Sequence, residues 1–393
     1  MKKILIVIDY YLPGYKAGGP IRSIVNMVEQ LGDEFQFNIL TSDRDLGNPQ
    51  PYSNIQSGSW YPVGKAQVLY LTLSQKHLWK WCQLLNQLDY DLLYLNSYFS
   101  RLSIQTLWLR KLRQLPRRPL VLAPRGEFSP GALALKAYKK QPYRLLSRLL
   151  SLEQGLVWHA STPYERDDIQ KATIKQVAIV TAKPVVYGVC DLTASVASDV
   201  PARTKTAGKL RVVFVSRISR KKNLDTALRL LQGVRGQVTF DIYGPLEDPK
   251  YWRECEALIA GLPAEVQVQY RDAIVPAQVS QVFATAHLFL FPTRGENFGH
   301  VIAEALAAGC PVLLSDQTPW QSLEEKGIGW DIPLAEPERF QAVLNHCVAM
   351  EPGEFEQWSC RAKEYMLTIE REQQMTVLRD YRHLFNAALN NQS

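Results

Sequence analysis

The chain has 393 residues, of which 46% are hydrophobic and 21% charged, an ordinary globular usage that excludes disorder, collagen and coiled coil as overall descriptions. No stretch reaches the roughly 18 uninterrupted apolar residues that a membrane-spanning helix needs. The formal net charge is +7, and the surplus is local, because residues 101–148 hold twelve lysines and arginines against one acid, Glu127. Such a patch attracts phosphate on nucleic acid, anionic lipid or a phosphorylated substrate.

The first residues resemble the start of a signal peptide, since two lysines precede the apolar run Ile4–Ile8. Asp9 interrupts this run before it reaches the roughly 7–15 residues of a secretory core, so we expect a buried strand instead. The six cysteines are far apart and form no C-x-x-C pair, which predicts reduced thiols and a cytoplasmic location.

The first half of the chain alternates short apolar runs with helical patterns. Runs typical of buried strands lie at 4–8, 35–41, 67–71, 91–95 and 119–123. Helical patterns lie at 21–31, 76–88, 101–114, 137–152 and 163–171. Short apolar strands separated by helices predict a mainly parallel sheet.

Residues 191–209 show no apolar period and are predicted to be a linker, after which the alternation restarts. Strands are expected at 210–215, 238–243, 266–270, 287–291 and 311–314. Helices are expected at 223–231, 248–260, 276–285, 299–308 and from 336 to near the end. Two successive α/β units predict two Rossmann-like lobes, with ligands bound between them at the carboxyl ends of the parallel strands.

Several nucleotide and hydrolase motifs are missing from the sequence. It contains no G-x-G-x-x-G, no P-loop, no G-x-S-x-G and no H-E-x-x-H. Two D-x-D triplets, Asp43-Arg44-Asp45 and Asp89-Tyr90-Asp91, could each hold a divalent ion on a nucleotide. The first lies in a polar turn and the second precedes a predicted strand, so we favour structural roles and predict no metal site.

The segment 291–311 carries the densest chemical signal. Gly295 and Gly299 free the backbone between a strand and a helix to approach a ligand closely. The N-terminus of that helix is a place where an anion is stabilised. Glu296 lies in the loop and Glu304 in the second helical turn, so the two carboxylates can reach different parts of one extended ligand.

A second cluster, residues 213–223, lies at the carboxyl end of the first strand of the second lobe. Arg217 and Lys222 fall in the strand-to-helix turn, where they can clamp a diphosphate. Arginine would do so as a fork and lysine as a point charge. The alternative is an ordinary exposed basic turn.

These segments resemble a known family. The E-x7-E pattern from Glu296 to Glu304 within GENFGHVIAEALAAGCPV, the stretch VSRISRKKN and the early Gly18-Gly19-Pro20 are similar to retaining glycosyltransferases of family 4. The resemblance covers most of the second lobe and is loose over the first. It implies an α/β GT-B fold, two Rossmann-like lobes with parallel sheets facing a central cleft.

The resemblance also implies a division of the chain and roles for residues. Residues 1–200 would form the acceptor-side lobe and 208–371 the nucleotide-sugar-binding lobe, with a helix at about 372–393 packing back on the first. The implied catalytic residues are Glu296 on the sugar hydroxyls and Arg217 and Lys222 on the leaving diphosphate. The implied donor-binding residues are Gly18, Gly19, Asn297, Phe298, Gly299, Glu304 at the ribose, and Ile274 and Val275 at the nucleobase.

One position departs from the family pattern. Many members carry a histidine after the fourth or fifth N-terminal strand, where this chain has Arg125. Arg125 is the acceptor-side candidate, and two interpretations stay open: it holds an acceptor phosphate, or it pairs with Glu127 and orders the loop. His159 ends another apolar strand and is interpreted as a structural histidine.

The activity implied by the resemblance is retaining transfer of a hexose-type sugar from a UDP- or GDP-linked donor. The acceptor would be a saccharide or a polyprenyl-linked glycan in cell-surface polysaccharide or glycolipid synthesis. Because the basic clamp can replace a metal, we expect no metal and no cofactor besides the nucleotide-sugar co-substrate. With no carboxylate placed as a nucleophile, same-face attack best explains retention.

The basic segment 136–149 combines lysines and arginines with leucines at helical spacing. A basic amphipathic helix is typical of a membrane-surface element, which predicts a peripheral enzyme on the inner face of the plasma membrane. The alternative is an ordinary helix with a solvated basic face. No RNA-binding signature is present, so we expect no nucleic-acid partner.

Two other classes compete with this interpretation. One is a sugar-nucleotide epimerase or glycan phosphorylase of GT-B-like fold, which would share the diphosphate clamp. The other is a non-enzymatic two-lobed sugar-binding protein, a class that is usually exported, which the expected lack of a signal peptide argues against.

Overall fold

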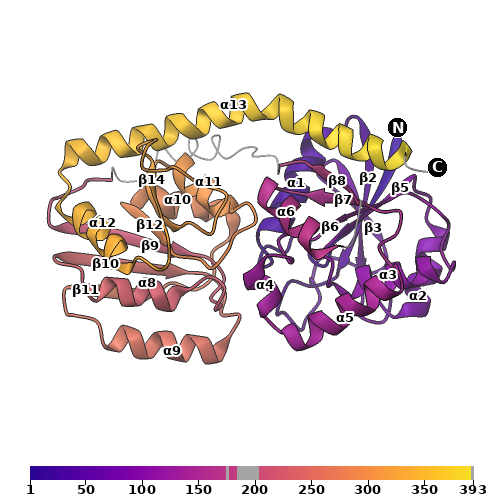
Figure 1. The fold of residues 1–393 in the computed structure, drawn as a ribbon, viewed down its shortest axis with the longest axis horizontal. Coiled ribbons are helices and arrows are strands. Elements are labelled where there is room, and N and C mark those ends of the chain that lie inside the picture. The colour runs from indigo at the N-terminus through magenta and orange to yellow at the C-terminus, as the bar shows by residue number, and fades with distance from the viewer. Residues whose placement is uncertain (174–176, 184–202, 391–393) are drawn as a thin grey trace. The chain divides into compact units, whose positions relative to one another are not determined.

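The computed structural model describes residues 1–173, 177–183 and 203–390. They fall into two compact units, which Figure 1 draws with their elements labelled. The first unit comprises residues 1–185 and 374–393, and the second comprises residues 186–373. The predicted lobe boundary near residue 200 lies outside the described residues.

The first unit is built on a twisted sheet that is eight-stranded over the described residues, in the order β3-β4-β2-β1-β5-β6-β7-β8. Neighbouring strands run parallel except for β3 and β4. The strands are β1 (Lys2–Val7), β2 (Phe35–Ser42), β3 (Trp60–Val63), β4 (Ala66–Leu71), β5 (Leu92–Asn96), β6 (Leu120–Ala123), β7 (Val157–Ala160) and β8 (Ala178–Thr181).

Helices cover both faces of this sheet. They are α1 (Gly19–Leu31), α2 (Leu78–Gln87), α3 (Arg101–Lys111), α4 (Pro130–Ala134), α5 (Ala137–Leu149) and α6 (Pro163–Ala172). Alternate residues of β1 enter different cores: Ile4 and Ile6 pack in one cluster with α1, and Leu5 packs in the other with α2 and α3. Burial on both faces explains why the strands are continuous apolar runs.

The second unit holds a sheet that, within its described part, has six parallel strands in the order β11-β10-β9-β12-β13-β14. Its strands are β9 (Lys209–Val215), β10 (Gln237–Tyr243), β11 (Val266–Tyr270), β12 (Leu288–Phe291), β13 (Val312–Ser315) and β14 (Gly329–Ile332). Its helices are α8 (Leu224–Leu231), α9 (Pro249–Ala260), α10 (Pro276–Thr285), α11 (His300–Ala307), α12 (Pro337–Ala349) and the start of α13 (Pro352–Asn390).

The predicted strands and helices are present in both units, with shifted ends. The helix predicted to reach residue 114 ends at Lys111, and Arg113 has a left-handed φ of 58°. The short elements β3, β8, β14 and α4 were not predicted by the alternation. β3 is an antiparallel edge strand containing Pro62, which hides the usual strand signal.

The predicted linker covers residues 191–209. Its residues up to 202 lie outside the described residues, and for residues 203–209 the prediction is wrong. Arg203 is partly buried and donates to the carbonyl of Ala286 (2.9 Å) and to Ser359 Oγ (2.6 Å). Lys205 is buried and donates to the carbonyl of Val348 (3.0 Å). Residues 203–209 are therefore part of the second unit, because their cations bind main-chain carbonyls within it.

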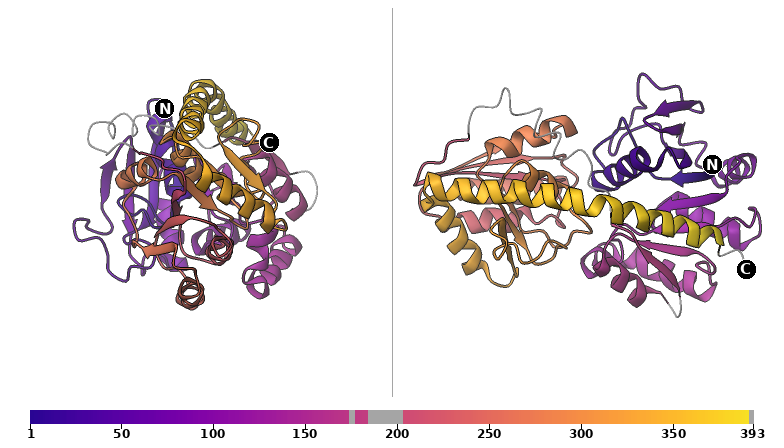
Figure 2. Two further views of the ribbon diagram at one scale, coloured as in Figure 1. Left: turned by 90° about the vertical axis from the view of Figure 1, so that its left-hand side faces the viewer. Right: turned by 90° about the horizontal axis from the view of Figure 1, so that it is seen from above.

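Helix α13 is one continuous helix of 39 residues, drawn in yellow in Figure 2. Its residues from 374 onward belong to the first unit. There Phe385 lies 5.3 Å from the ring of Phe35 and 6.0 Å from that of Tyr94. Arg382 donates to both carboxylate oxygens of Glu34 at 2.7 Å. The end of the chain therefore completes the core of the first unit. No described helix has the length and apolar character that crossing a bilayer demands.

We predict that Phe385→Ala lowers the free energy of unfolding by about 3–5 kcal/mol, because it leaves a cavity in a fully buried aromatic cluster. Urea unfolding followed by tryptophan fluorescence measures the change. Met375→Ala is the control on the same helix, since Met375 is 75% exposed. Equal stability of the two variants would contradict the packing of this helix segment.

Candidate functional site

The predicted donor residues gather at the carboxyl edge of the sheet in the second unit. Four loops emerge there: residues 216–223 after β9, 244–248 after β10, 271–275 after β11 and 292–299 after β12. Because all these strands are parallel, their loops meet at one edge, the usual ligand site of such sheets.

The loops after β9 and β10 are joined through their backbones. Ile218 N donates to the carbonyl of Pro245 (2.9 Å), and Glu247 N donates to the carbonyl of Ile218 (3.2 Å). Gly244 has a φ of 142°, and a Cβ there would lie 1.8 Å from the carbonyl oxygen of Ser216. Only glycine lets the backbones of these two loops approach each other this closely.

Gly244 also ties in the loop after β11. Its N–H donates to the carbonyl of Asp272 (3.0 Å), and its own carbonyl accepts from Tyr270 Oη (2.9 Å). The predicted nucleobase residues lie in this loop. Ile274 is partly buried against the core, whereas Val275, the residue before α10, is 42% exposed. Val275 therefore offers an accessible apolar surface.

The loop after β12 is held to the loop after β9 by the buried Asn223. Its Nδ2 donates to the carbonyl of Pro292 (2.8 Å), and its Oδ1 accepts from Arg294 Nε (2.9 Å). Asn223 has a left-handed φ of 63°, which asparagine tolerates better than most residues. Sequence reasoning did not single out Asn223 or Arg294; an asparagine directly before a helix in a strand-to-helix turn is the signal that could have found the first.

These backbone and amide contacts bring two predicted catalytic residues together. Lys222 forms an ion pair with Glu296, and both side chains are largely buried, at 12% and 13% exposure. The Lys222 ammonium also lies 5.5 Å from the ring centroid of Phe291. The third predicted catalytic residue, Arg217, pairs instead with Glu247 through Nη1 and Oε2 at 3.0 Å. A cationic turn and a carboxylate loop thus face each other.

The remaining donor-binding residues surround the start of α11. Gly295 and Gly299 have φ values of 150° and 80°, as expected from their role in freeing the loop. Asn297 and Phe298 are partly buried, and the Phe298 carbonyl accepts from Trp320 Nε1 (2.7 Å). Glu304 is partly buried on α11 and interacts with neighbouring groups. These residues therefore lie on one loop and one helix, as predicted.

The predicted glycines of the first unit lie at the N-terminus of α1. Gly18 precedes the helix with a φ of 74°, and Gly19 is its first residue. A Cβ on Gly18 would meet no atom within 4 Å. The glycine is therefore required by its backbone conformation and not by a neighbouring atom.

Arg125 and Glu127 follow β6 but do not pair with each other, so that interpretation is wrong. Arg125 donates to Asn96 Oδ1 from Nε (3.0 Å) and Nη2 (2.8 Å), and to Ser161 Oγ from Nη1 (3.3 Å). Glu127 accepts from Ser97 Oγ (2.7 Å) and Tyr98 N (2.6 Å). Burial raises the pKa of Glu127. The strands β5 and β7 supply partners that are remote in sequence.

His159 is structural, which confirms that interpretation. It is fully buried, and burial lowers its pKa to about 3, so the ring is neutral. Nε2 lies 2.8 Å from the carbonyl of Ala182 and must carry the proton, so Nδ1 accepts from Tyr94 Oη at 2.6 Å. Tyr94 Oη in turn accepts from Arg125 Nη2 (2.9 Å). The histidine thus anchors the residues that hold Arg125.

The D-x-D triplets have structural roles. Asp45 accepts from the main-chain N–H groups of Tyr15 (3.1 Å) and Lys16 (3.3 Å), and Asp91 accepts from that of Lys3 (2.8 Å). Among the described residues, no group of three or more His, Cys, Asp and Glu side chains is arranged to hold a metal ion.

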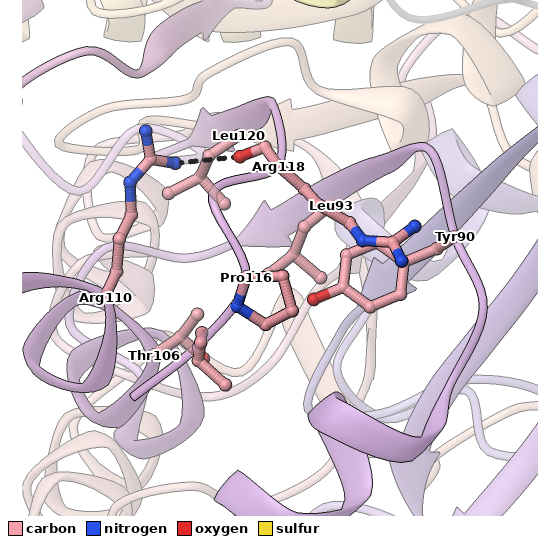
Figure 3. A pocket seen from close by; sticks show the side chains of 8 residues that line it. Tyr90, Leu93, Thr106, Arg110, Pro116, Arg118 and Leu120 are labelled. Atoms are coloured by element: carbon pink, nitrogen blue, oxygen red, sulfur yellow. Dashed lines mark hydrogen bonds between the residues drawn. The ribbon is translucent and has the colours of Figure 1, made fainter. Parts of the chain in front are cut away.

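A small cavity lies at the amino edge of the sheet in the first unit, near the starts of β5 and β6 (Figure 3). Arg110 Nη1 donates to the carbonyl of Arg118 (3.3 Å) beside it. The volume of the cavity is about 10 Å³. That is room for about one water molecule, so this cavity is not a substrate site.

Comparison with known proteins identifies the domain that carries the site. Residues 198–364 match the family model described as "Glycosyl transferases group 1". The chain carries a group 1 glycosyltransferase domain. A sulfoquinovosyl transferase of Arabidopsis thaliana is 28% identical over 102 residues, which are 26% of this chain but only 18% of that relative's length.

Solved structures share the fold over nearly the whole chain. The sucrose-phosphate synthase of Thermosynechococcus elongatus superposes with a TM-score of 0.74 and 17% identity, covering 98% of this chain and 100% of that one. Anabaena HepE, solved in complex with UDP-glucose, gives a TM-score of 0.67 and 16% identity over 98% and 100% of the two chains. The predicted GT-B fold is confirmed.

We predict that Gly244→Ala destabilises the protein by about 3 kcal/mol or more, because its Cβ would collide with the Ser216 carbonyl and force both loops apart. Thermal unfolding of the full chain measures this. Gly353→Ala is the control, because a Cβ there meets no atom within 4 Å. Unfolding at the same temperature in both variants would show that the close approach is not required.

Proposed function

We propose that the chain is a retaining glycosyltransferase that moves a hexose-type sugar from a UDP- or GDP-linked donor to a saccharide or polyprenyl-linked acceptor. The observation that carries this proposal is the meeting of Lys222 and Glu296, from two different loops, at the carboxyl edge of one parallel sheet. The group 1 glycosyltransferase match and the UDP-glucose complex of a protein with the same fold support it.

Leaving-group stabilisation supplies most of the catalysis in this proposal. As the bond between the anomeric carbon and the diphosphate breaks, negative charge grows on the diphosphate oxygens. Arg217, Lys222 and the N–H groups at the start of α11 stabilise that charge, and such fixed electrostatics is usually the largest catalytic contribution. Since these cations neutralise the diphosphate, the mechanism needs no metal.

The sugar and nucleoside bind along the same edge. Glu296 accepts hydrogen bonds from sugar hydroxyls, and Glu304 accepts from the ribose. Main-chain N–H groups of residues 297–299 contact the donor, while Val275 packs against the base. The acceptor hydroxyl attacks the face from which the diphosphate leaves, its proton passes to a diphosphate oxygen, and the configuration is retained. Both carboxylates already bind hydroxyls, so neither serves as a nucleophile.

Arg125 orders the acceptor side in this proposal. Its guanidinium donates to the neutral side chains of Asn96 and Tyr94 on β5 and of Ser161, the residue after β7. A guanidinium held in this way fixes the loops after those strands. We therefore assign it a positioning role and not direct contact with an acceptor phosphate.

Helix α5 is the proposed membrane contact, near the inner face of the plasma membrane. Tyr138, Leu145 and Leu149 are 73%, 69% and 78% exposed on it. Lysines and arginines at positions 136, 139, 140, 144 and 148 flank them. Exposed apolar side chains bordered by cations fit an anionic bilayer surface, which suits a lipid-linked acceptor.

We predict that Lys222→Ala lowers turnover by about 10²-fold or more, the scale for losing one preorganised group that stabilises developing charge. Donor hydrolysis and transfer, assayed with UDP-, GDP- and dTDP-hexoses, measure the loss. Arg220→Ala is the control in the same loop, because Arg220 is exposed and pairs with Glu254. Unchanged turnover in Lys222→Ala would overturn the proposed function, and epimerised nucleotide formed without acceptor would favour the epimerase class.

We predict that the protein sediments with vesicles containing phosphatidylglycerol and not with pure phosphatidylcholine. Leu149→Ala should weaken this partitioning by about tenfold or more, because the variant lacks three apolar carbons that would otherwise move from water into the bilayer surface. Leu367→Ala, which removes a 42% exposed leucine of α13 in the second unit, is the control. Failure to sediment with either vesicle type would exclude the membrane contact and leave the glycosyltransferase proposal intact.

A further inference from the structure

Both cations of the proposed diphosphate clamp already have a carboxylate partner. Lys222 pairs with Glu296, and Arg217 pairs with Glu247 at 3.0 Å. Glu296 has a role of its own in the proposed function, because it can bind the sugar hydroxyls once a phosphate replaces it at Lys222. Nothing in the proposed function uses Glu247.

The position of Glu247 is set by the backbone. Its N–H donates to the carbonyl of Ile218, the residue after Arg217, and Leu246 forms a parallel bridge with Ile218. Gly244 permits this approach, since a side chain there would strike Ser216. Glu247 is therefore held opposite Arg217 by the same ladder that builds the site, unlike a surface acid that finds its partner by chance.

The pair is also accessible enough to exchange. The side chain of Arg217 is 34% exposed and that of Glu247 is 43% exposed, so water can solvate the carboxylate once it is displaced. A diphosphate that binds Arg217 through its fork of N–H groups must compete with Glu247 for those donors. The carboxylate therefore weakens diphosphate binding by about the strength of the exposed ion pair that is lost.

We propose that Glu247 is a positioning residue that competes with the nucleoside diphosphate for Arg217, and so keeps the product from binding too tightly. This inference rests on the proposed function. Exposed ion pairs contribute about 0.2–1 kcal/mol, which corresponds to a change of roughly 1.4- to 5-fold in binding. Removing the charge of Glu247 should tighten diphosphate binding within that range.

The test is calorimetric titration of the full chain with UDP and GDP, each compared with its nucleoside. Glu247→Gln should tighten binding of the nucleoside diphosphate by about two- to fivefold and leave nucleoside binding unchanged. Glu247→Asp keeps the charge and should return the affinity toward that of the original chain. Glu254→Gln is the matched control, because it removes the same charge from the partner of Arg220 in the same loop region.

Each outcome decides between the two proposals. If Glu247→Gln and Glu254→Gln tighten binding equally, the effect is general electrostatics and the competition is overturned. An equal change with the nucleoside would show a structural effect on the loop and overturn it as well. If the original chain binds neither UDP nor GDP, the proposed function fails and this inference fails with it.

Discussion

The close approach of two backbones at Gly244 is the constraint on which the site of the second unit depends. A parallel ladder normally ends where its strands end. Here it continues for three residues, because Ile218 pairs with Leu246 and no side chain stands between Gly244 and Ser216. The same glycine bonds to the carbonyl of Asp272, so three loops share one support.

That support determines which charges meet. Extending the ladder sets Arg217 opposite Glu247, and the turn that follows carries Lys222 to Glu296. Asn223 fastens the turn to the strand end at Pro292, so the cations and the acidic loop are held from both sides. Electrostatic stabilisation is effective only when charged groups need little reorganisation, which is what such anchoring provides.

The sequence predicted the strands best where burial on both faces makes consecutive residues apolar. Strands such as Val212–Val215 are buried on both faces and read as apolar runs, and Gly309 ends α11 with a left-handed φ of 70°. β14 was missed because Asp331 lies within it, and this carboxylate accepts from the N–H groups of Ser322 and Leu323. A strand loses its continuous apolar pattern when one of its residues is a polar side chain that binds a neighbouring turn.

Side-chain partners across strands were the least predictable part of the site. The family resemblance placed Lys222 and Glu296 on the same donor but did not predict the ion pair between them. One of the two interpretations of Arg125 paired it with Glu127, two residues away, yet its partners Asn96 and Ser161 are 29 and 36 residues distant, at the ends of neighbouring strands. Glu247, 30 residues from Arg217, carried no local signal at all. Such pairings follow from strand order, which a single sequence does not state.

The two sheets hold arginines at their carboxyl edges in contrasting ways, and the contrast bears on where phosphate binds. Arg125 is partly buried, donates to neutral oxygens of three side chains and lies near the buried carboxylate of Glu165, so moving it would leave several buried polar groups unsatisfied. The partner of Arg217 is the exposed carboxylate of Glu247, which water can solvate once it is displaced. Only the second arrangement lets an arginine exchange one anion for another at small cost, which supports the proposal that the diphosphate binds to the second unit and not to the first.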